Sequence, residues 1–500
     1  MVWFRTMEKT RKFRQIPSVD RVLSLVGEAP GERPVERANR VAAIREAVED
    51  LRRRMRGGEP VEPAECTPEA VARAAMARAR DRLSGTLRPV INLTGVILHT
   101  NLGRAPLAPE WLDEVRDGVS GYCNLEYDIA GRRRGARDDH LDAMLRRVVP
   151  AAEAGLVVNN CAAAVLLALT ALARGREVVV SRGELVEIGG GFRVPEVMAS
   201  SGARLVEVGT TNRTRRKDYE AAIGPETAML FKAHPSNFRM VGFVEEVGVA
   251  AMAEMAHRHG LPAVVDLGSG LVSSPGVPAA DGEPGPQQVL EAGADVVCVS
   301  GDKLLGGCQA GIVLGREAFL LPMRRHPLMR ALRVDKLVIG TLQAVLRRHL
   351  AGDLDGIPVL AAMRLPAATV RRRCESLVRR VRRAGTPDAL GLQIVPARSE
   401  AGGGTLPASP IPSFGVAVRL AGVPEDEVDA RLRACDPPIL GRVQDGAVLL
   451  DLRTLLPGQM DAVVRALAGL PSLRAPATPA IPSKEASPED ALPEAGGDPG

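Results

Sequence analysis

A lysine in a glycine-rich segment offers the clearest chemistry in this sequence. Lys303 lies in the run SGDKLLGG at residues 300–307. The apolar residues 295–299 (DVVCV) predict a short buried strand, so the lysine is expected on a tight loop at the strand's carboxyl end, where open α/β sheets bind ligands. Burial among small residues lowers the pKa of a lysine, and the free amine can then attack a carbonyl carbon. An ordinary surface lysine is the alternative that this segment alone leaves open.

A carboxylate occupies the matching position upstream. Asp266 ends the apolar run AVVD at residues 263–266 and is followed by LGSG. The interval between Asp266 and Lys303 leaves room for one helix between two parallel strands. Pyridoxal phosphate chemistry needs such a pair, because the lysine forms a Schiff base and the carboxylate keeps the pyridine nitrogen protonated. Aspartates at strand ends are common, so the pair by itself is a moderate indication.

Other polar residues are expected at the same edge of the sheet. Asn160, Cys161 and Ala162 follow a predicted strand and open a helix, whose free backbone N–H groups would form a phosphate site. His234 also follows a predicted strand, where a histidine either stacks on a cofactor ring or only caps its loop. Two further candidate cofactor contacts are Asn237 and Asp302.

Three arginines are candidate ligands for an anion. Arg104 lies in a polar loop punctuated by glycine. Arg330 and Arg333 are three residues apart in the segment HPLMRALRVDK, and they share one face if this segment is helical. Guanidinium groups bind phosphate-like oxyanions through two parallel hydrogen bonds, so these side chains are suited to an anionic reactant.

Composition points to a protein of the cytoplasm. The 500 residues are 45% hydrophobic and 25% charged, with a formal net charge of +5, and so mild a basicity does not by itself indicate nucleic acid. We therefore expect no DNA partner. We also expect no membrane partner, since no apolar run approaches a membrane span. The seven cysteines are scattered without a CxxC pair, which favours reduced thiols over a disulfide or zinc framework.

The order of elements predicts an α/β fold with a mainly parallel sheet. Between residues 156 and 314, short apolar runs alternate with helical patterns, which is typical of βαβ units. We expect four parts: a helical N-terminal domain (1–65), a catalytic core (66–350), a small α+β domain (351–470) and a disordered Pro/Ala/Glu/Gly-rich tail (471–500).

The N-terminal region is basic. Residues 1–60 hold 14 lysines and arginines against 9 acidic residues. A helical stripe from residue 36 to residue 56 carries arginines on its outer face. This face is either an ordinary solvated surface or a contact surface for the phosphate backbone of an RNA.

Nine collinear segments between residues 16 and 350 make the chain similar to the bacterial L-seryl-tRNA(Sec) selenium transferases. The segments are IPSVDRVL, INLTGVILHTNLGRAPL, NLEYD, SRGELVEIGGGFRVPEVM, TTNRT, FKAHPSNF, VVDLGSG, SGDKLLGG and HPLMRALRVDK. The resemblance implies a fold-type I pyridoxal phosphate enzyme that is a cytosolic homodecamer. Its implied substrates are seryl-tRNA(Sec) and selenophosphate, and its implied tRNA-binding part is the N-terminal domain.

The resemblance also implies roles for individual residues. Lys303 corresponds to the Schiff-base lysine and Asp266 to the partner of the pyridine nitrogen. The three arginines correspond to anion ligands near the cofactor. The implied reaction is β-elimination of water from the seryl group, followed by addition of selenium.

The chain departs from the family pattern at three points. Position 308 is cysteine where proline is expected, Cys161 lies in the predicted phosphate site, and the C-terminal tail has no counterpart. Cys308 raises a desulfurase-like nucleophile as an alternative. Two further alternatives are a related pyridoxal phosphate lyase for a small amino acid or amino sugar, and a catalytically inactive RNA-binding homologue. The basic N-terminal region disfavours the lyase, and the retained lysine, aspartate and arginines disfavour the inactive homologue.

Overall fold

The computed structural model divides the chain into two compact units, with the boundary between Pro89 and Val90. The described residues are 15–27, 33–83, 85–188, 192–235, 238, 240–385, 389–407 and 409–473. The predicted disordered tail therefore lies outside the described residues from residue 474 onward.

The first unit is helical. Its elements are α2 (Val19–Val26), α3 (Pro34–Gly57), η1 (Pro63–Cys66) and α4 (Pro68–Leu83). Val22, Ile44, Val48 and Val71 share one apolar core, so α4 packs with the two preceding helices. Because α4 contributes to this core, the helical unit extends to Pro89, beyond the expected boundary at residue 65.

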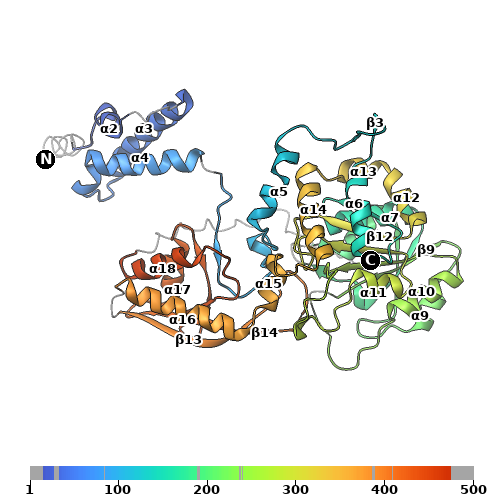
Figure 1. Ribbon diagram of the computed structural model, residues 1–500. Coiled ribbons are helices and arrows are strands. Elements are labelled where there is room, and N and C mark those ends of the chain that lie inside the picture. The colour runs from blue at the N-terminus through green and yellow to red at the C-terminus, as the bar shows by residue number, and fades with distance from the viewer. Residues whose placement is uncertain are drawn as a thin grey trace, which may run out of the picture. The chain divides into compact units, whose positions relative to one another are not determined.

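A seven-stranded sheet forms the centre of the second unit (Figure 1). Its strand order is β4-β12-β11-β10-β9-β5-β8, and the pairs from β11 to β8 are parallel, which confirms the predicted α/β fold. β12 runs antiparallel to both of its neighbours. The strands are β4 (Ala154–Val158), β5 (Glu177–Ser181), β8 (Arg204–Val208), β9 (Thr227–Ala233), β10 (Ala263–Gly268), β11 (Val296–Ser300) and β12 (Gly311–Gly315).

Helices cover both faces of this sheet, because alternate residues of a strand point to opposite sides. On one face, Val178 and Val264 pack into the core that holds residues of α7, α8 and α12. On the other, their strand neighbours Val179 and Val265 pack with residues of α5, α6, α10, α11 and α14. The helices are α5 (Pro109–Ser120), α6 (Asp139–Val148), α7 (Cys161–Ala173), α8 (Val194–Ser201), α9 (Arg216–Ala222), α10 (Val249–Arg258), α11 (Pro286–Glu291), α12 (Glu317–Arg325), α13 (Pro327–Leu332), α14 (Lys336–Ala351) and α15 (Pro358–Arg364).

The C-terminal part contains a second, antiparallel sheet with its own core. The strand order is β13-β14-β17-β16, helices α16 and α17 pack against its strands, and α18 packs on α16 (Figure 1). The elements are β13 (Leu390–Ser399), β14 (Ile411–Leu420), β16 (Arg442–Gln444), β17 (Ala447–Asp451), α16 (Ala367–Arg383), α17 (Glu425–Arg433) and α18 (Met460–Gly469). The core of this sheet also holds Ile91 and Leu93 from the start of the unit.

The segment that starts the second unit packs into both cores, with Ile91 and Leu93 in the core of the C-terminal sheet and residues 97–98 in that of the seven-stranded sheet. β1 (Ile91–Asn92) pairs in parallel with β15 (Ile439–Leu440), and the following residues pair with the end of β13, where Ile97 N–H donates to the Glu400 carbonyl at 2.9 Å. Short hairpins complete the fold, formed by β2 (Tyr127–Asp128) with β3 (Arg133–Arg134) and β6 (Glu187–Ile188) with β7 (Phe192–Arg193).

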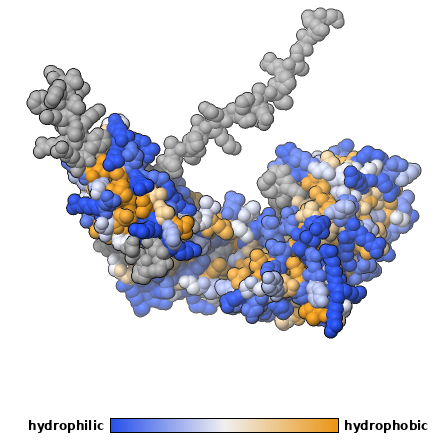
Figure 2. Space-filling model, turned by 90° about the horizontal axis from the view of Figure 1, so that it is seen from above, coloured by the Kyte–Doolittle hydropathy of each residue, from blue (hydrophilic) through white to orange (hydrophobic). Residues whose placement is uncertain are grey.

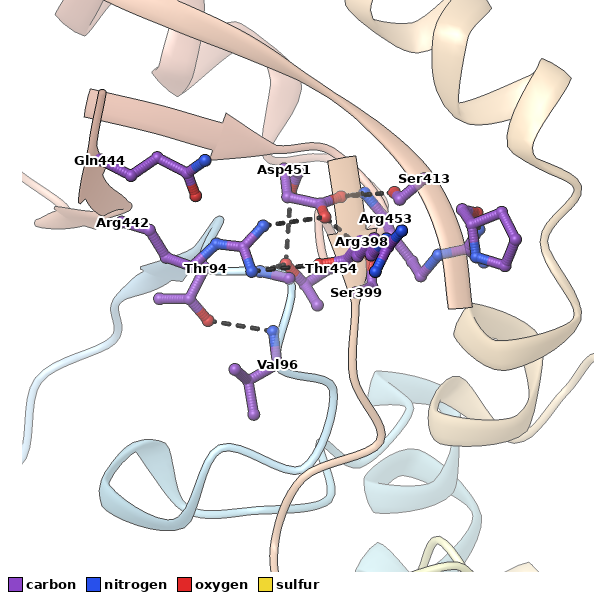
Figure 3. A network of polar contacts seen from close by, with 12 residues as sticks. Thr94, Val96, Arg398, Ser399, Ser413, Arg442, Gln444, Asp451, Arg453 and Thr454 are labelled. Atoms are coloured by element: carbon purple, nitrogen blue, oxygen red, sulfur yellow. Dashed lines mark hydrogen bonds and ion pairs between the residues drawn. The ribbon is translucent and has the colours of Figure 1, made fainter. Parts of the chain in front are cut away.

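A buried carboxylate secures this junction (Figure 3). Asp451 is fully buried and accepts hydrogen bonds from the hydroxyls of Ser399 and Ser413, each at 2.7 Å. Gly95, at φ +77°, lies so close that a Cβ there would be 2.5 Å from Asp451 Oδ2. The hydrogen bonds to Asp451 thus hold the end of β13 at Ser399. The loop that follows, residues 400–405, extends toward the loop of Lys303.

None of the helices in the described part of the chain combines the length and apolar character needed to cross a bilayer. Hydrophilic side chains dominate the face seen in Figure 2, with apolar patches scattered between them.

Candidate functional site

Lys303 lies on a tight loop directly after β11. The loop is closed by backbone hydrogen bonds, one from Gly307 N–H to the Gly301 carbonyl at 2.9 Å and one from Leu304 N–H to the Ser269 carbonyl at 3.0 Å. The lysine is 4% exposed. Burial lowers the pKa of its amine, the nearby Cys161 and Asp266 act against that lowering, and the Arg104 guanidinium adds to it more weakly. Burial of the side chain thus favours the uncharged form of the amine.

Asp266 lies in the neighbouring strand β10 and faces the same site. It is 7% exposed, and burial raises the pKa of its carboxyl, while the hydrogen bond from Cys161 and the nearness of Lys303 act against that rise. The thiol of Cys161 donates to Asp266 Oδ1 at 3.4 Å. A buried carboxylate with so weak a partner is costly unless a cation joins it. A protonated ring nitrogen would supply that cation.

The start of α7 lies beside this carboxylate. Asn160 is the N-cap, and its side chain accepts a hydrogen bond from Ala163 N–H at 2.8 Å. Cys161 and Ala162 occupy the first turn, where backbone N–H groups have no partner within the helix. Burial raises the pKa of the Cys161 thiol well above its usual range, so the thiol stays protonated and acts as a donor. The structure thus brings together the predicted phosphate-binding turn, Asp266 and Lys303.

His234 lies at the end of the strand next to Asp266. Its backbone N–H donates to the Asp266 carbonyl at 2.8 Å, and its Nε2 lies 3.5 Å from a carboxylate oxygen of the buried Glu283. The sequence reasoning did not single out Glu283. It lines a cavity of about 190 Å³ in the loop that follows β10. The predicted contact Asn237 lies outside the described residues.

Arg104 approaches the lysine loop from the start of the second unit. Its Nη1 lies 3.0 Å from Asp302 Oδ2, and the backbone N–H of Ala105 donates to the Asp302 carbonyl at 3.3 Å. Arg104 adopts φ +60°, a left-handed conformation that side chains other than glycine seldom occupy. Asp302 thus holds this guanidinium near Lys303, which gives it an orienting role that the sequence did not specify.

Arg330 and Arg333 do not share a helical face. Helix α13 ends at Leu332, and Arg333 is extended and bridges to Val158 at the end of β4. The guanidinium of Arg333 lies 3.2 Å from Glu126 Oε1, whereas Arg330 is exposed on the helix. The segment leaves the helix because Arg333 pairs with a strand, which sequence spacing alone cannot reveal.

The sequence reasoning missed a glycine loop that lies against the lysine. The carbonyl of Gly404 lies 3.5 Å from Lys303 Nζ. Gly402, Gly403 and Gly404 all have positive φ, at +73°, +63° and +68°. A Cβ on Gly403 would be 2.9 Å from Leu98 Cβ, so both the backbone conformation and the space require glycine there. The run AGGGT was the available signal.

Replacing Gly403 with alanine is expected to impair the site beyond its effect on stability. The left-handed conformation costs alanine about 1–2 kcal/mol of unfolding free energy, and the crowding against Leu98 would displace the Gly404 carbonyl from Lys303. A displacement of this kind can slow turnover up to about 100-fold. Gly422→Ala is the matched control, because Gly422 has φ +73° with open space around it. Equal turnover of the two variants at equal stability would remove the loop from the site.

Cys308 does not have the character of a nucleophile. Its Sγ lies 3.7 Å from the Val338 carbonyl, and burial raises the pKa of the thiol to about 12. A reactive cysteine needs a low pKa, because the thiolate is the attacking form. The geometry therefore disfavours the desulfurase alternative.

Comparisons with known proteins identify the family of this chain. The sequence profile of the L-seryl-tRNA selenium transferase family matches residues 90–456. The chain is 45% identical over 467 residues to the L-seryl-tRNA(Sec) selenium transferase of Moorella thermoacetica, covering 92% of this chain and 97% of the relative. It is 44% identical over 464 residues to that of Geobacter sulfurreducens, covering 92% and 99% of the two chains.

A solved structure supports the fold. D-glucosaminate-6-phosphate ammonia-lyase matches with a TM-score of 0.53 at 21% identity, over 79% of this chain and 98% of that one. The fold is that of the fold-type I pyridoxal phosphate enzymes, and pyridoxal phosphate is the cofactor of this class. With near-complete coverage at this level of identity, the chain belongs to the L-seryl-tRNA selenium transferase family.

Proposed function

We propose that this chain converts L-seryl-tRNA(Sec) to L-selenocysteinyl-tRNA(Sec) in the cytoplasm, with selenophosphate as the selenium donor. The observation that carries the proposal is the 45% identity to a transferase of that name over almost its whole length. The buried Lys303 beside Asp266 supports it, because the chemistry needs an amine and a carboxylate at one site. By family resemblance the active form is a homodecamer.

Lys303 and Asp266 have separate tasks in this reaction. The uncharged amine of Lys303 takes the proton from Cα of the seryl group. Asp266 would hold a proton on the ring nitrogen of the cofactor, and His234, whose backbone N–H donates to the Asp266 carbonyl, would lie beside that ring. Pyridoxal phosphate, when bound, supplies an electron-accepting ring that stabilises the negative charge left at Cα when its proton is removed. The Cβ hydroxyl then leaves as water with a proton that Lys303 returns, and a Cα=Cβ double bond remains. The selenium of selenophosphate adds at Cβ while Lys303 returns a proton to Cα, and a water molecule cleaves the phosphorus–selenium bond and releases phosphate.

The turn at Asn160, Cys161 and Ala162 would bind the cofactor phosphate. Its backbone N–H groups point out of the start of α7, and the helix dipole favours negative charge at that end. Arg104, Arg330 and Arg333 supply positive charge for a second anion, the selenium donor. Asp302 orients Arg104 by the ion pair at 3.0 Å.

The helical N-terminal unit contributes to tRNA binding in this proposal. The positive surplus of residues 1–60 supports this role. Much of the arginine stripe on α3 is already paired, since Arg52 and Arg56 contact Glu49, Arg53 contacts Asp50 and Arg54 contacts Glu65. The RNA contact of this unit therefore relies on fewer free charges than its sequence indicates.

The proposed function is tested by supplying purified protein with pyridoxal phosphate, seryl-tRNA(Sec) and selenophosphate. We expect selenocysteinyl-tRNA to form, with selenium recovered on the aminoacyl group. Free serine and a phosphorylated amino sugar serve as parallel substrates for the lyase alternative. Turnover of a small substrate without turnover of seryl-tRNA would contradict the proposal.

Removing one anion-binding arginine is expected to separate elimination from selenium transfer. A buried anion that loses one guanidinium partner binds about 2–5 kcal/mol more weakly, or roughly tens- to thousands-fold. We predict that at least one of Arg104→Ala, Arg330→Ala and Arg333→Ala consumes seryl-tRNA yet uses selenophosphate poorly. Arg104 is the strongest candidate, because it is paired with Asp302 and its charge acts on the neighbouring Lys303, whereas Arg330 is exposed on α13.

The measurement follows seryl-tRNA consumption and selenium incorporation separately in each variant, with bound cofactor checked by absorbance. Arg325→Ala on the neighbouring helix α12 is the control, since Arg325 is exposed and has no carboxylate partner among the described residues. If all three arginine variants fail at cofactor loading or at elimination, the anion site is elsewhere.

A further inference from the structure

Helix α16 carries an unusual concentration of positive charge. Its 17 residues hold seven arginines and a single acidic residue, Glu375. This surplus is larger than that of residues 1–60, in less than a third of the length. The helix packs against the C-terminal sheet and contains none of the residues of the proposed site.

Helix α16 has a buried apolar face and an exposed basic face. The apolar residues, Val370, Cys374, Leu377, Val378 and Val381, are buried and belong to the core of the C-terminal sheet. At 3.6 residues per turn, the exposed arginines fall within about one third of the circumference on the opposite side. These arginines are Arg371, Arg372, Arg379, Arg382 and Arg383.

Carboxylates neutralise little of this basic face. Arg371 pairs with Glu375 at 3.2 Å, and Arg372 donates only to the Thr369 hydroxyl at 2.8 Å. Within the described part of the chain, Arg379, Arg382 and Arg383 contact no carboxylate. On α3, by contrast, most arginines are paired with carboxylates. Among the described residues, helix α16 thus differs from α3 in leaving neighbouring arginines without a carboxylate partner.

We propose that the basic face of α16, made by Arg372, Arg379, Arg382 and Arg383, binds the phosphate backbone of the tRNA substrate. The inference rests on the proposed function and adds a second RNA contact, on the C-terminal sheet. Arg379 lies three and four residues before Arg382 and Arg383, a spacing of about 5–6 Å on a helix, and Arg372 lies about two turns, or roughly 10 Å along the axis, before Arg379. The four arginines therefore form a row along one side of the helix. Such a row reads backbone shape without reading bases, which suits a double-stranded RNA stem.

The test replaces Arg379, Arg382 and Arg383 together with glutamine and measures seryl-tRNA binding over a range of salt concentrations. Each lost phosphate contact flattens the slope of log affinity against log salt by about 1, so we expect a change of about 3. At moderate salt the affinity should fall at least about tenfold. The corresponding triple lysine variant keeps the charge and should retain most of the binding.

A second triple variant serves as the matched control. Arg147, Arg174 and Arg325 are exposed, and within the described residues none of them pairs with a carboxylate. Replacing these three with glutamine changes the net charge equally but leaves α16 intact. We expect the salt slope of this variant to match the parent. Visible cofactor absorbance and the unfolding midpoint show that each variant remains folded.

The possible outcomes separate this inference from the proposed function. If the parent converts seryl-tRNA and the α16 variant binds it as the control does, the basic face is not an RNA surface and the proposed function stands. If the α16 variant instead changes the molecular mass in solution at parental tRNA affinity, the face joins copies of the chain, and the inference is wrong. A parent that binds no seryl-tRNA would contradict both proposals.

Discussion

Lys303→Ala is expected to eliminate turnover and covalent attachment of the cofactor together. The lysine amine is both the attachment point and the base at Cα in the proposed reaction. Loss of general-base catalysis alone slows a reaction by about 10²–10⁴-fold, and loss of attachment adds to this. The fold should survive, because the side chain's one described hydrogen bond is at 3.5 Å.

The measurement is borohydride reduction of the protein with pyridoxal phosphate, followed by mapping of the labelled peptide. The parent should carry the label on Lys303, and the variant should show neither the label nor the visible absorbance. Lys217→Ala on α9 is the control for nonspecific labelling of lysines. A label that persists elsewhere in the site of the variant, with turnover, would show that Lys303 is not the attachment point.

Asp266→Asn is expected to keep the cofactor but lose most of the activity. The amide has the size of the carboxylate, and its carbonyl can still accept the hydrogen bond from Cys161. It cannot hold a proton on the ring nitrogen, because it carries no charge. Loss of one partner of a buried charge pair costs about 2–5 kcal/mol, which corresponds to roughly 30- to several thousand-fold in rate.

The test compares bound cofactor, read from absorbance, with the rate of seryl-tRNA consumption. Asp426→Asn on the exposed start of α17 is the control. Parental turnover in the Asp266 variant would remove this carboxylate from the mechanism. Loss of cofactor binding instead would indicate that its role is attachment and not electron withdrawal.

The pairing of Lys303 with Asp266 could be predicted because strand ends can be recognised from sequence. The apolar runs that end at Asp266 and precede Lys303 are too short for helices and are bounded by glycine. In a parallel sheet, strands of this kind place their carboxyl ends at one edge. β10 and β11 are in fact neighbours, with Asp266 paired in register with Cys298.

A second buried lysine shows the limit of that reasoning. Lys232 also lies at the end of a strand, and its sequence context does not rule it out as the reactive amine. In the structure its Nζ is 2.7 Å from Glu184 and 3.1 Å from the Val247 carbonyl, so the amine is already engaged. Only the folded chain distinguishes the two lysines, because Glu184 and Val247 come from segments far apart in the sequence.

The sequence by itself determined the alternation of strands and helices, the residues at the strand ends and the family. These features are local, since each depends on the period of apolar residues or on a short run of residue types. The tertiary structure decided the antiparallel direction of β12, the departure of Arg333 from helix α13 and the approach of the Gly402–Gly404 loop to Lys303. Each of these depends on pairing between distant segments, whose geometry is set by packing and hydrogen bonds that no local pattern records.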